Sequence, residues 1–256
     1  MARTANPVQL QFQTIDGFNS YIRKAETEME QTLLGKGSFL SSAASSTTVE
    51  HSPKEQISAE FWSGKNPVEV PDGLIHDWIG ATLIPGATVD DLLAVIQNYD
   101  KHKNIYKPEV IDSKLITRHD NDFQIYLRLK KKKIITVVLD TDHDVHYFSL
   151  DRTRAGCGSH TTRISEVEHA GTPHEQVMPA DTGFGFLWRL HSYWRFQQSE
   201  IGVCAECRAI SLTRNIPKGL GWIIEPIIYR LPRESLINTL KATREAVLSH
   251  VPRVRN

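Results

Sequence analysis

Two charged residues on one predicted strand are the first candidates for chemistry in this sequence. Residues 201–213 alternate as a strand does, so Cys204, Glu206 and Arg208 share one face. If that face is buried, the carboxylate and the guanidinium must satisfy each other or a polar ligand group, because an unpaired buried charge is very costly. In a cavity they would act as proton acceptor and donor. The same pattern also fits a cross-strand pair on the protein surface.

Two further segments supply candidates of the same kind. In 122–130, Tyr126 and Arg128 alternate with apolar residues, so they are polar anchors for a ligand if their face points inward. In 184–198, Arg195 lies on the more polar of two faces. An enzymatic hypothesis uses Arg195, Glu206, Arg208 or Tyr126 as proton donors and acceptors, and it requires two of them to converge.

The other face of 184–198 is aromatic. The even positions from 184 to 196 are mostly aromatic and include Trp188, Trp194 and Phe196. A face of this size either packs a solid core or lines a pocket for an apolar ligand, and both interpretations remain open.

Other local motifs favour ordinary structure over chemistry. Cys204 and Cys207 form a C-x-x-C, but residues three apart on a strand point to opposite faces. The acidic run 140–144 is spaced like a calcium loop, yet Val145 replaces the glycine that such a loop requires, so we predict a solvated strand end or turn. Nucleophile-elbow and nucleotide-binding motifs are absent, and the eleven histidines are scattered. We therefore predict no catalytic residue, no metal site and no cofactor.

A run of four lysines, 130–133, joins two apolar strand candidates. Such a cluster suits transient contact with anionic lipid head groups. It equally suits a hairpin turn in which the lysines maintain solubility and prevent edge pairing.

Composition limits the class of partner. The 256 residues carry 30 basic and 30 acidic side chains, so no net charge attracts nucleic acid or an anionic membrane. Three cysteines do not indicate a disulfide framework. No signal peptide or membrane-spanning run is visible, which predicts a cytoplasmic protein by default, although an exported form with its leader removed stays open. Nothing indicates an oligomeric state.

The elements that must position these residues follow from periodicity. Helical spacing covers 16–34, and a Ser/Thr-rich linker follows at 38–53, so we divide the chain into 1–60 (helix and linker) and 61–256 (main domain). The main domain begins with a strand at 74–84 and a helix from Thr88, where Asp91 completes a capping box. Further strands are predicted at 110–118, 122–130, 134–150, 159–169, 184–198 and 201–213, and a last helix at 232–250.

This order resembles the START-like superfamily, also called SRPBCC or polyketide-cyclase-like, over about residues 70–250. The segment Ala87 to Lys103, continued by Tyr106 to Leu115, is similar to the family's first helix and the strand that follows it. Ile223 to Pro226 and Leu231 to Leu236 are similar to its final loop and lid helix. The chain also looks like bacterial members with an extra N-terminal helix.

The resemblance implies an α+β helix-grip fold, in which a curved antiparallel sheet of about seven strands wraps a long C-terminal helix over a cavity. It implies binding, transport or sequestration of a hydrophobic small molecule or lipid there, and no catalytic residue transfers. A cyclase-, aromatase- or hydrolase-like enzyme and a domain with a filled core are the alternatives. The cavity candidates are Tyr126, Arg128, Trp188, Trp194, Arg195, Phe196, Glu206, Arg208, Trp222, Leu236 and Leu240.

Overall fold

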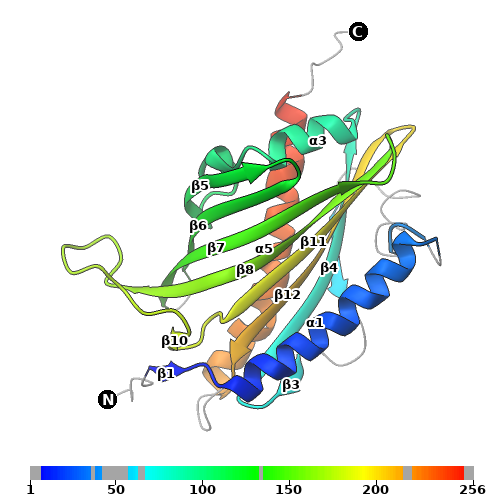
Figure 1. Ribbon diagram of the computed structural model, residues 1–256. Helices are drawn as coiled ribbons and strands as arrows, with labels where there is room; N and C mark the ends of the chain where they lie inside the picture. Colours follow the sequence, from blue (N-terminus) through cyan, green and yellow to red (C-terminus); the bar gives the residue numbers. More distant parts are fainter. Residues whose placement is uncertain are drawn as a thin grey trace.

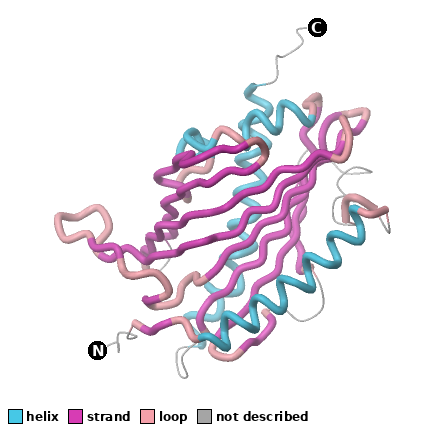
Figure 2. The backbone as a smooth tube through the Cα atoms, in the orientation of Figure 1, coloured by secondary structure: helices cyan, strands magenta, loops and turns pink. Residues whose placement is uncertain are grey.

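A long antiparallel sheet forms the body of the protein (Figures 1 and 2). The computed structural model describes residues 7–35, 38–41, 57–62, 67–132, 135–215 and 221–250, and for 221–229 the backbone alone. The sheet runs in the order β2-β4-β12-β11-β8-β7-β6-β5, and β3 and β9 pair with β4 and β8. Every described pairing is antiparallel.

Seven long strands confirm the predicted set. They are β4 (Gly73–Pro85), β5 (Val110–His119), β6 (Asp122–Lys132), β7 (Thr136–Ser149), β8 (Arg154–Glu168), β11 (Arg189–Ser199) and β12 (Gly202–Arg214). Short strands complete the described pairings: β1 (Val8–Gln9) with β10 (Thr182–Gly183), β2 (Ile57–Phe61), β3 (Val68–Val70) and β9 (Gln176–Val177). These pieces are too short to show an alternation in the sequence.

Two long helices cover opposite faces of the sheet (Figure 1). Helix α5 (Gly221–His250) lies along one face, here called the inner face, and α1 (Phe12–Leu33) crosses the opposite, outer face over β4, β12 and β11. This arrangement is the predicted helix-grip fold with an N-terminal helix added. Helix α5 begins at Gly221, eleven residues before the predicted start at 232. Pro226 and Pro232 both lie within the helix.

The segment between β4 and β5 is helical, as predicted. It contains α3 (Val89–Ile96), the 3-10 turn η1 (Tyr99–Lys101) and α4 (His102–Ile105). The backbone N–H of Asp91 donates to Thr88 Oγ1 at 3.2 Å, and the N–H of Thr88 donates to Asp91 Oδ2 at 2.9 Å. This capping box satisfies two N–H groups that the first turn leaves without intrahelical partners.

The sheet carries a separate core on each face. On the inner face, Leu92, Phe123, Phe196 and Val247 belong to one cluster of fully or nearly fully buried side chains. On the outer face, Phe18 of α1 packs with a second cluster on β4 and β12. Helix α1 is therefore part of the same packed body as the sheet, and the division drawn at residue 60 falls inside β2, which pairs with β4.

Candidate functional site

The two faces of the sheet separate the candidate residues into two groups. Because side chains alternate along a strand, Trp194 and Phe196 of β11 face α5, whereas Arg195 between them faces α1. Leu236 and Leu240 of α5 pack with Trp78 and Cys207 on the inner face. Five other candidates lie on the outer face: Tyr126, Arg128, Arg195, Glu206 and Arg208.

Two tryptophan candidates remain. Trp188 precedes β11 and packs into the cluster beneath α1, together with Phe18 and Leu212. The side chain of Trp222 lies outside the described residues.

A row of small side chains crosses the middle of the inner face. Ser192 of β11 pairs with Ser159 of β8 on one side and with Ala209 of β12 on the other. All three retain accessible surface although they point toward α5, and so do Trp194 and Leu127. A filled core would bury these positions, as it buries Phe196 and Cys157 further along the same strands. The inner face is therefore not fully covered along this row, which is called the hollow below.

Helix α5 packs closely on β4, at Gly80. At Gly80 of β4, an added Cβ would lie 2.8 Å from Leu240 Cδ1, so a larger residue would push the helix away. Toward its C-terminal end, Val247 is fully buried in the inner core. The helix is thus tightly packed on β4, and its C-terminal part joins the inner core.

A pocket of about 600 Å³ lies where the middle of α5 faces β5 and β6. Its volume is within the range of roughly 300 to 1,000 Å³ that small-molecule sites occupy. Its apolar lining is Pro108, Val110, Ile111 and Leu231. Strand β6 connects the hollow with this pocket. Its inner-face residues are Leu127, Leu129 and Lys131, and Lys131 lines the pocket.

The same pocket is strongly basic. Five lysines line it against two glutamates, Glu109 and Glu234; they are Lys103, Lys107, Lys130, Lys131 and Lys132. Two of the lysines have acidic neighbours: Lys131 pairs with Glu109, and Lys103 Nζ lies 2.9 Å from Asp112 Oδ1. The excess of positive charge suits an anionic group at the edge of an apolar pocket.

Hydroxyl groups add polar contacts inside the inner core. Tyr99 and Tyr147 share a hydrogen bond of 2.7 Å, and the Tyr106 hydroxyl lies 3.1 Å from Thr243 Oγ1 of α5. Burial raises the pKa of Tyr106 to about 12, so its hydroxyl stays protonated at neutral pH. These groups can donate a hydrogen bond to a ligand without placing a charge in the core.

Arg208 and Glu206 do not form the pair that their spacing suggested. Arg208 is bound by Asp77 of β4, with 2.6 Å between Nη2 and Oδ2. Glu206 Oε2 instead accepts from the Ser41 backbone N–H at 2.7 Å. Burial raises the pKa of Glu206, and the hydrogen bonds from Ser41 counteract part of that effect. Both acidic groups serve the contact between the sheet and the N-terminal segment.

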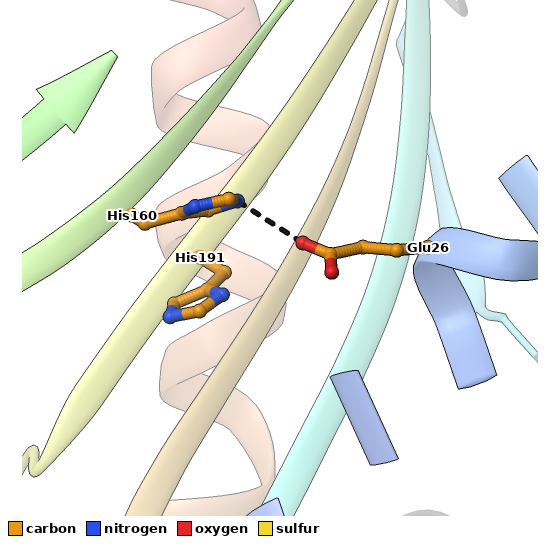
Figure 3. A group of neighbouring side chains, drawn as sticks. All are labelled: Glu26, His160 and His191. Atoms are coloured by element: carbon orange, nitrogen blue, oxygen red, sulfur yellow. Dashed lines mark ion pairs between the residues drawn. The ribbon is translucent and has the colours of Figure 1, made fainter. Parts of the chain in front are cut away.

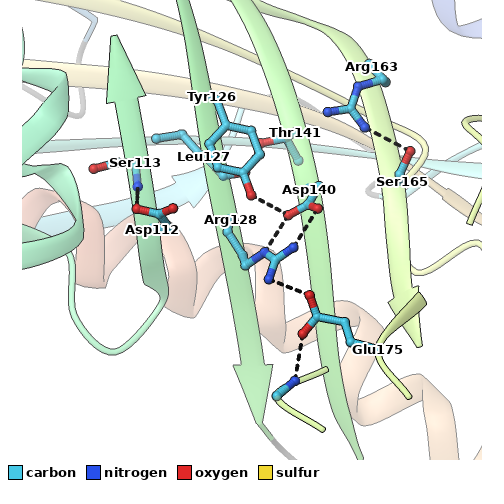
Figure 4. Close-up of polar contacts among 11 residues, drawn as sticks. Asp112, Ser113, Tyr126, Leu127, Arg128, Asp140, Thr141, Arg163, Ser165 and Glu175 are labelled. Carbon is cyan, nitrogen blue, oxygen red and sulfur yellow. Dashed lines mark hydrogen bonds and ion pairs between the residues drawn. The ribbon is translucent and has the colours of Figure 1, made fainter. Parts of the chain in front are cut away.

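Arg195 and the β6 pair also have structural partners. Arg195 donates to the backbone oxygens of Phe39 and Met29, which holds the end of α1 on the sheet. Arg128 lies between Asp140 and Glu175, and Tyr126 donates to Asp140 Oδ1 at 2.7 Å (Figure 4). Arg195 and Glu206 lie opposite each other on β11 and β12, but each of the four proposed acid–base residues is held by a structural partner.

The acidic run at 140–144 is strand, and the predicted strand end or turn is wrong there. These residues lie inside β7, where β6 and β8 pair with them on both sides. Burial acts to raise the pKa of Asp140, but hydrogen bonds from Arg128 and Tyr126 outweigh it and hold the pKa below its usual value. The alternating acidic residues are balanced by Arg128 and Arg163 on neighbouring strands.

The C-x-x-C cysteines lie on opposite faces, as predicted. Cys204 packs with Phe39 on the outer face, and Cys207 packs with Leu240 on the inner face. Cys157, Cys204 and Cys207 are all free and buried in the described part of the chain. Burial raises the pKa of Cys157 to about 12, so its thiol stays protonated and unreactive.

A second pocket, of about 650 Å³, lies on the outer face between α1 and strands β5 to β8 and β11. Its lining includes Glu26, Met29, Phe148, His160 and Tyr193. The sequence did not indicate this pocket, because its residues come from elements more than a hundred positions apart. Helical spacing predicted α1 itself, but not the face of the sheet that it covers.

Comparisons with known proteins give distant structural likenesses only. No family model and no curated protein matches the sequence. Among solved structures, the chain is similar to a STAR-related lipid transfer protein from Xanthomonas axonopodis, with 16% identity, 75% of this chain and 98% of that one covered, and a TM-score of 0.47. Human STARD10 has 10% identity, coverage of 80% and 77%, and a TM-score of 0.46. The Zhui aromatase/cyclase from Streptomyces sp. R1128 has 12% identity, coverage of 70% and 92%, and a TM-score of 0.38.

Likeness at this level does not assign a function, which must rest on the geometry of the chain itself. Within the described ranges, no helix is long and apolar enough to cross a membrane.

Proposed function

We propose that this chain binds a hydrophobic small molecule or lipid that carries an anionic group. The apolar part lies between the inner face and α5, over Ser159, Ser192 and Ala209. The anionic group lies at the basic pocket beside β5 and β6. The observation that carries the proposal is the row of small, accessible side chains at the centre of a face that α5 otherwise covers.

Each part of the proposed site has a physical role. The hollow buries apolar ligand surface, and each buried methylene contributes about 0.8 kcal/mol. Trp194 and Leu127 border it and remain accessible to a ligand. The lysines at the pocket attract a carboxylate or phosphate, and Ile111 supports the adjacent apolar segment. Such a site favours binding, and transfer or sequestration, over catalysis, because the acid–base candidates are held by structural partners on the other face.

The pocket provides a direct binding test. Ile111 and Ile116 both lie on β5 and are 43% and 57% exposed, but only Ile111 lines the pocket. Oleate is titrated into each variant by displacement of the fluorescent fatty acid cis-parinaric acid. Ile111→Asp is expected to weaken oleate binding by roughly 10- to 100-fold, the equivalent of one lost apolar side-chain contact. Ile116→Asp is expected to bind as the wild type does. Equal affinity in all three proteins would contradict the proposed role of this pocket.

A further inference from the structure

Two histidines and a glutamate meet on the outer face, away from the proposed ligand site. Glu26 comes from α1, His160 from β8 and His191 from β11 (Figure 3). One ligand atom of each residue lies within 4.8 Å of the other two. All three side chains are partly buried, and Glu26 and His160 line the 650 Å³ pocket between α1 and the sheet.

The contacts within this cluster leave a nitrogen without a hydrogen bond. His160 Nε2 is buried and lies 3.3 Å from Glu26 Oε1, yet it makes no hydrogen bond with any residue that the structure describes. The imidazole rings of His160 and His191 stack with their centroids 4.4 Å apart. Two imidazoles beside one carboxylate offer lone pairs that can share a cation or a proton.

Neighbouring side chains hold the three groups in place. The Tyr193 hydroxyl donates to Glu26 Oε1 at 2.8 Å and lies 3.4 Å from His191 Nδ1. Phe18 packs against the His191 ring at 86°, with the ring centroids 5.2 Å apart. Partners of this kind orient the ligands of metal sites, and their loss typically costs 10- to 100-fold in metal affinity.

We propose that Glu26, His160 and His191 bind a divalent transition-metal ion, with Zn²⁺ as the best fit. Two imidazoles and one carboxylate are a ligand set that Zn²⁺ accepts, with a water molecule in the fourth position. Bond lengths of about 2.0 to 2.2 Å place tetrahedral ligand atoms roughly 3.3 Å apart, so small side-chain rotations bring the three groups into position. Glu26 and His160 line the pocket, so a small polar ligand there would have access to the ion.

This site is independent of hydrophobic ligand binding on the inner face, because the sheet separates the two. It also links α1 to the two central strands, so the ion would fasten the N-terminal helix to the sheet. Metal binding is therefore expected to raise the melting temperature, since a ligand that binds only the folded state stabilises it by mass action.

Metal binding is tested on the full chain after removal of metal with a chelator. Co²⁺ is titrated while its visible absorption is recorded, and Zn²⁺ then competes for the same site. The expected result is one equivalent of Co²⁺ in a tetrahedral environment, displaced by Zn²⁺, with a rise in melting temperature. His160→Ala and Glu26→Gln are expected to abolish the Co²⁺ spectrum, and Tyr193→Phe to weaken binding by about 10- to 100-fold.

Two controls keep the result unambiguous. His146→Ala removes a histidine of the same pocket that bonds Asp122 at 2.6 Å instead, and it is expected to leave binding unchanged. Circular dichroism identifies any variant that fails to fold, and Glu26→Gln preserves the size of the side chain for that reason. No Co²⁺ spectrum in the wild type would overturn the proposal. Binding that survives both His160→Ala and Glu26→Gln, or that requires His146, would overturn it as well.

Discussion

Arg208 and Asp77 form an ion pair that is almost completely sealed between the sheet and α1. Arg208 Nη2 lies 2.6 Å from Asp77 Oδ2, and each side chain is only 4% exposed. Tyr21 of α1 donates to the same oxygen of Asp77 at 2.8 Å. The pair therefore connects β12, β4 and the N-terminal helix, and its charges are used for assembly of the fold.

Removing the carboxylate of this pair should destabilise the protein strongly. Asp77→Ala leaves a buried guanidinium uncompensated, and we expect a loss of about 3 to 5 kcal/mol in the free energy of unfolding. Tyr21→Phe removes one hydrogen bond and should cost only about 1 kcal/mol. Urea denaturation measures both. A loss below 1 kcal/mol in Asp77→Ala would show that the pair is not buried as described.

Stability should fall as the pH is lowered below neutrality, and His76 should contribute to the fall. Burial lowers the pKa of His76 to about 4, and its Nε2 lies 3.0 Å from Thr213 Oγ1. In the unfolded chain the pKa is near 6.5, so the unfolded state gains a proton first as the pH drops. The stabilisation is complete above pH 6.5 and is lost between about pH 6.5 and 4, up to ~3 kcal/mol.

The variant His76→Gln tests this assignment. Urea unfolding at pH 7.5 and pH 4.5 should show a smaller loss of stability in His76→Gln than in the wild type. The exposed His174 provides the matched control, and His174→Gln should keep the full loss. If His76→Gln loses as much stability on acidification as the wild type does, His76 is not the group that titrates.

The lysines at the basic pocket should select for ligand charge. Lys130 and Lys132 are exposed at the pocket, so Lys130→Glu with Lys132→Glu reverses two charges without disturbing the core. We expect the double variant to bind oleate at least about tenfold more weakly, because each lost charge contact is worth about 1 kcal/mol. Binding of the uncharged oleyl alcohol should not change. Lys24→Glu, on the exposed side of α1, is the control. Equal weakening for both ligands would show that the lysines do not contact a charged group.

The seven long strands and the two long helices could be predicted from the sequence, because their apolar residues repeat with clear periods. The period of two also correctly separated Trp194 from Arg195 and Cys204 from Cys207. It did not show which face meets α5, since both faces of this sheet are covered by a helix. Glu206 and Arg208 therefore share a face as predicted, but that face lies under α1, where Ser41 and Asp77 bind them.

Groups of residues that meet only through long-range contacts could not be predicted from the sequence. His160 and His191 are 31 positions apart, and each looks like an isolated histidine in the sequence. They become neighbours only through the register of β8 with β11, which places them directly opposite each other. The row Ser159, Ser192 and Ala209 likewise depends on register, and single small residues carry no signal of a hollow by themselves.

Filling the hollow tests hydrophobic ligand binding most directly. Ser192→Phe places a large side chain on the inner face, and Gln197→Phe places one on the outer face of the same strand. Native mass spectrometry of the purified proteins should detect a co-purified lipid in the wild type and in Gln197→Phe, and none in Ser192→Phe. The melting temperature of Ser192→Phe should be unchanged or higher, because the ring fills empty space. Lipid retained by Ser192→Phe, or a loss of stability of about 1 to 3 kcal/mol, as overpacking of a filled core produces, would contradict a ligand site at this position.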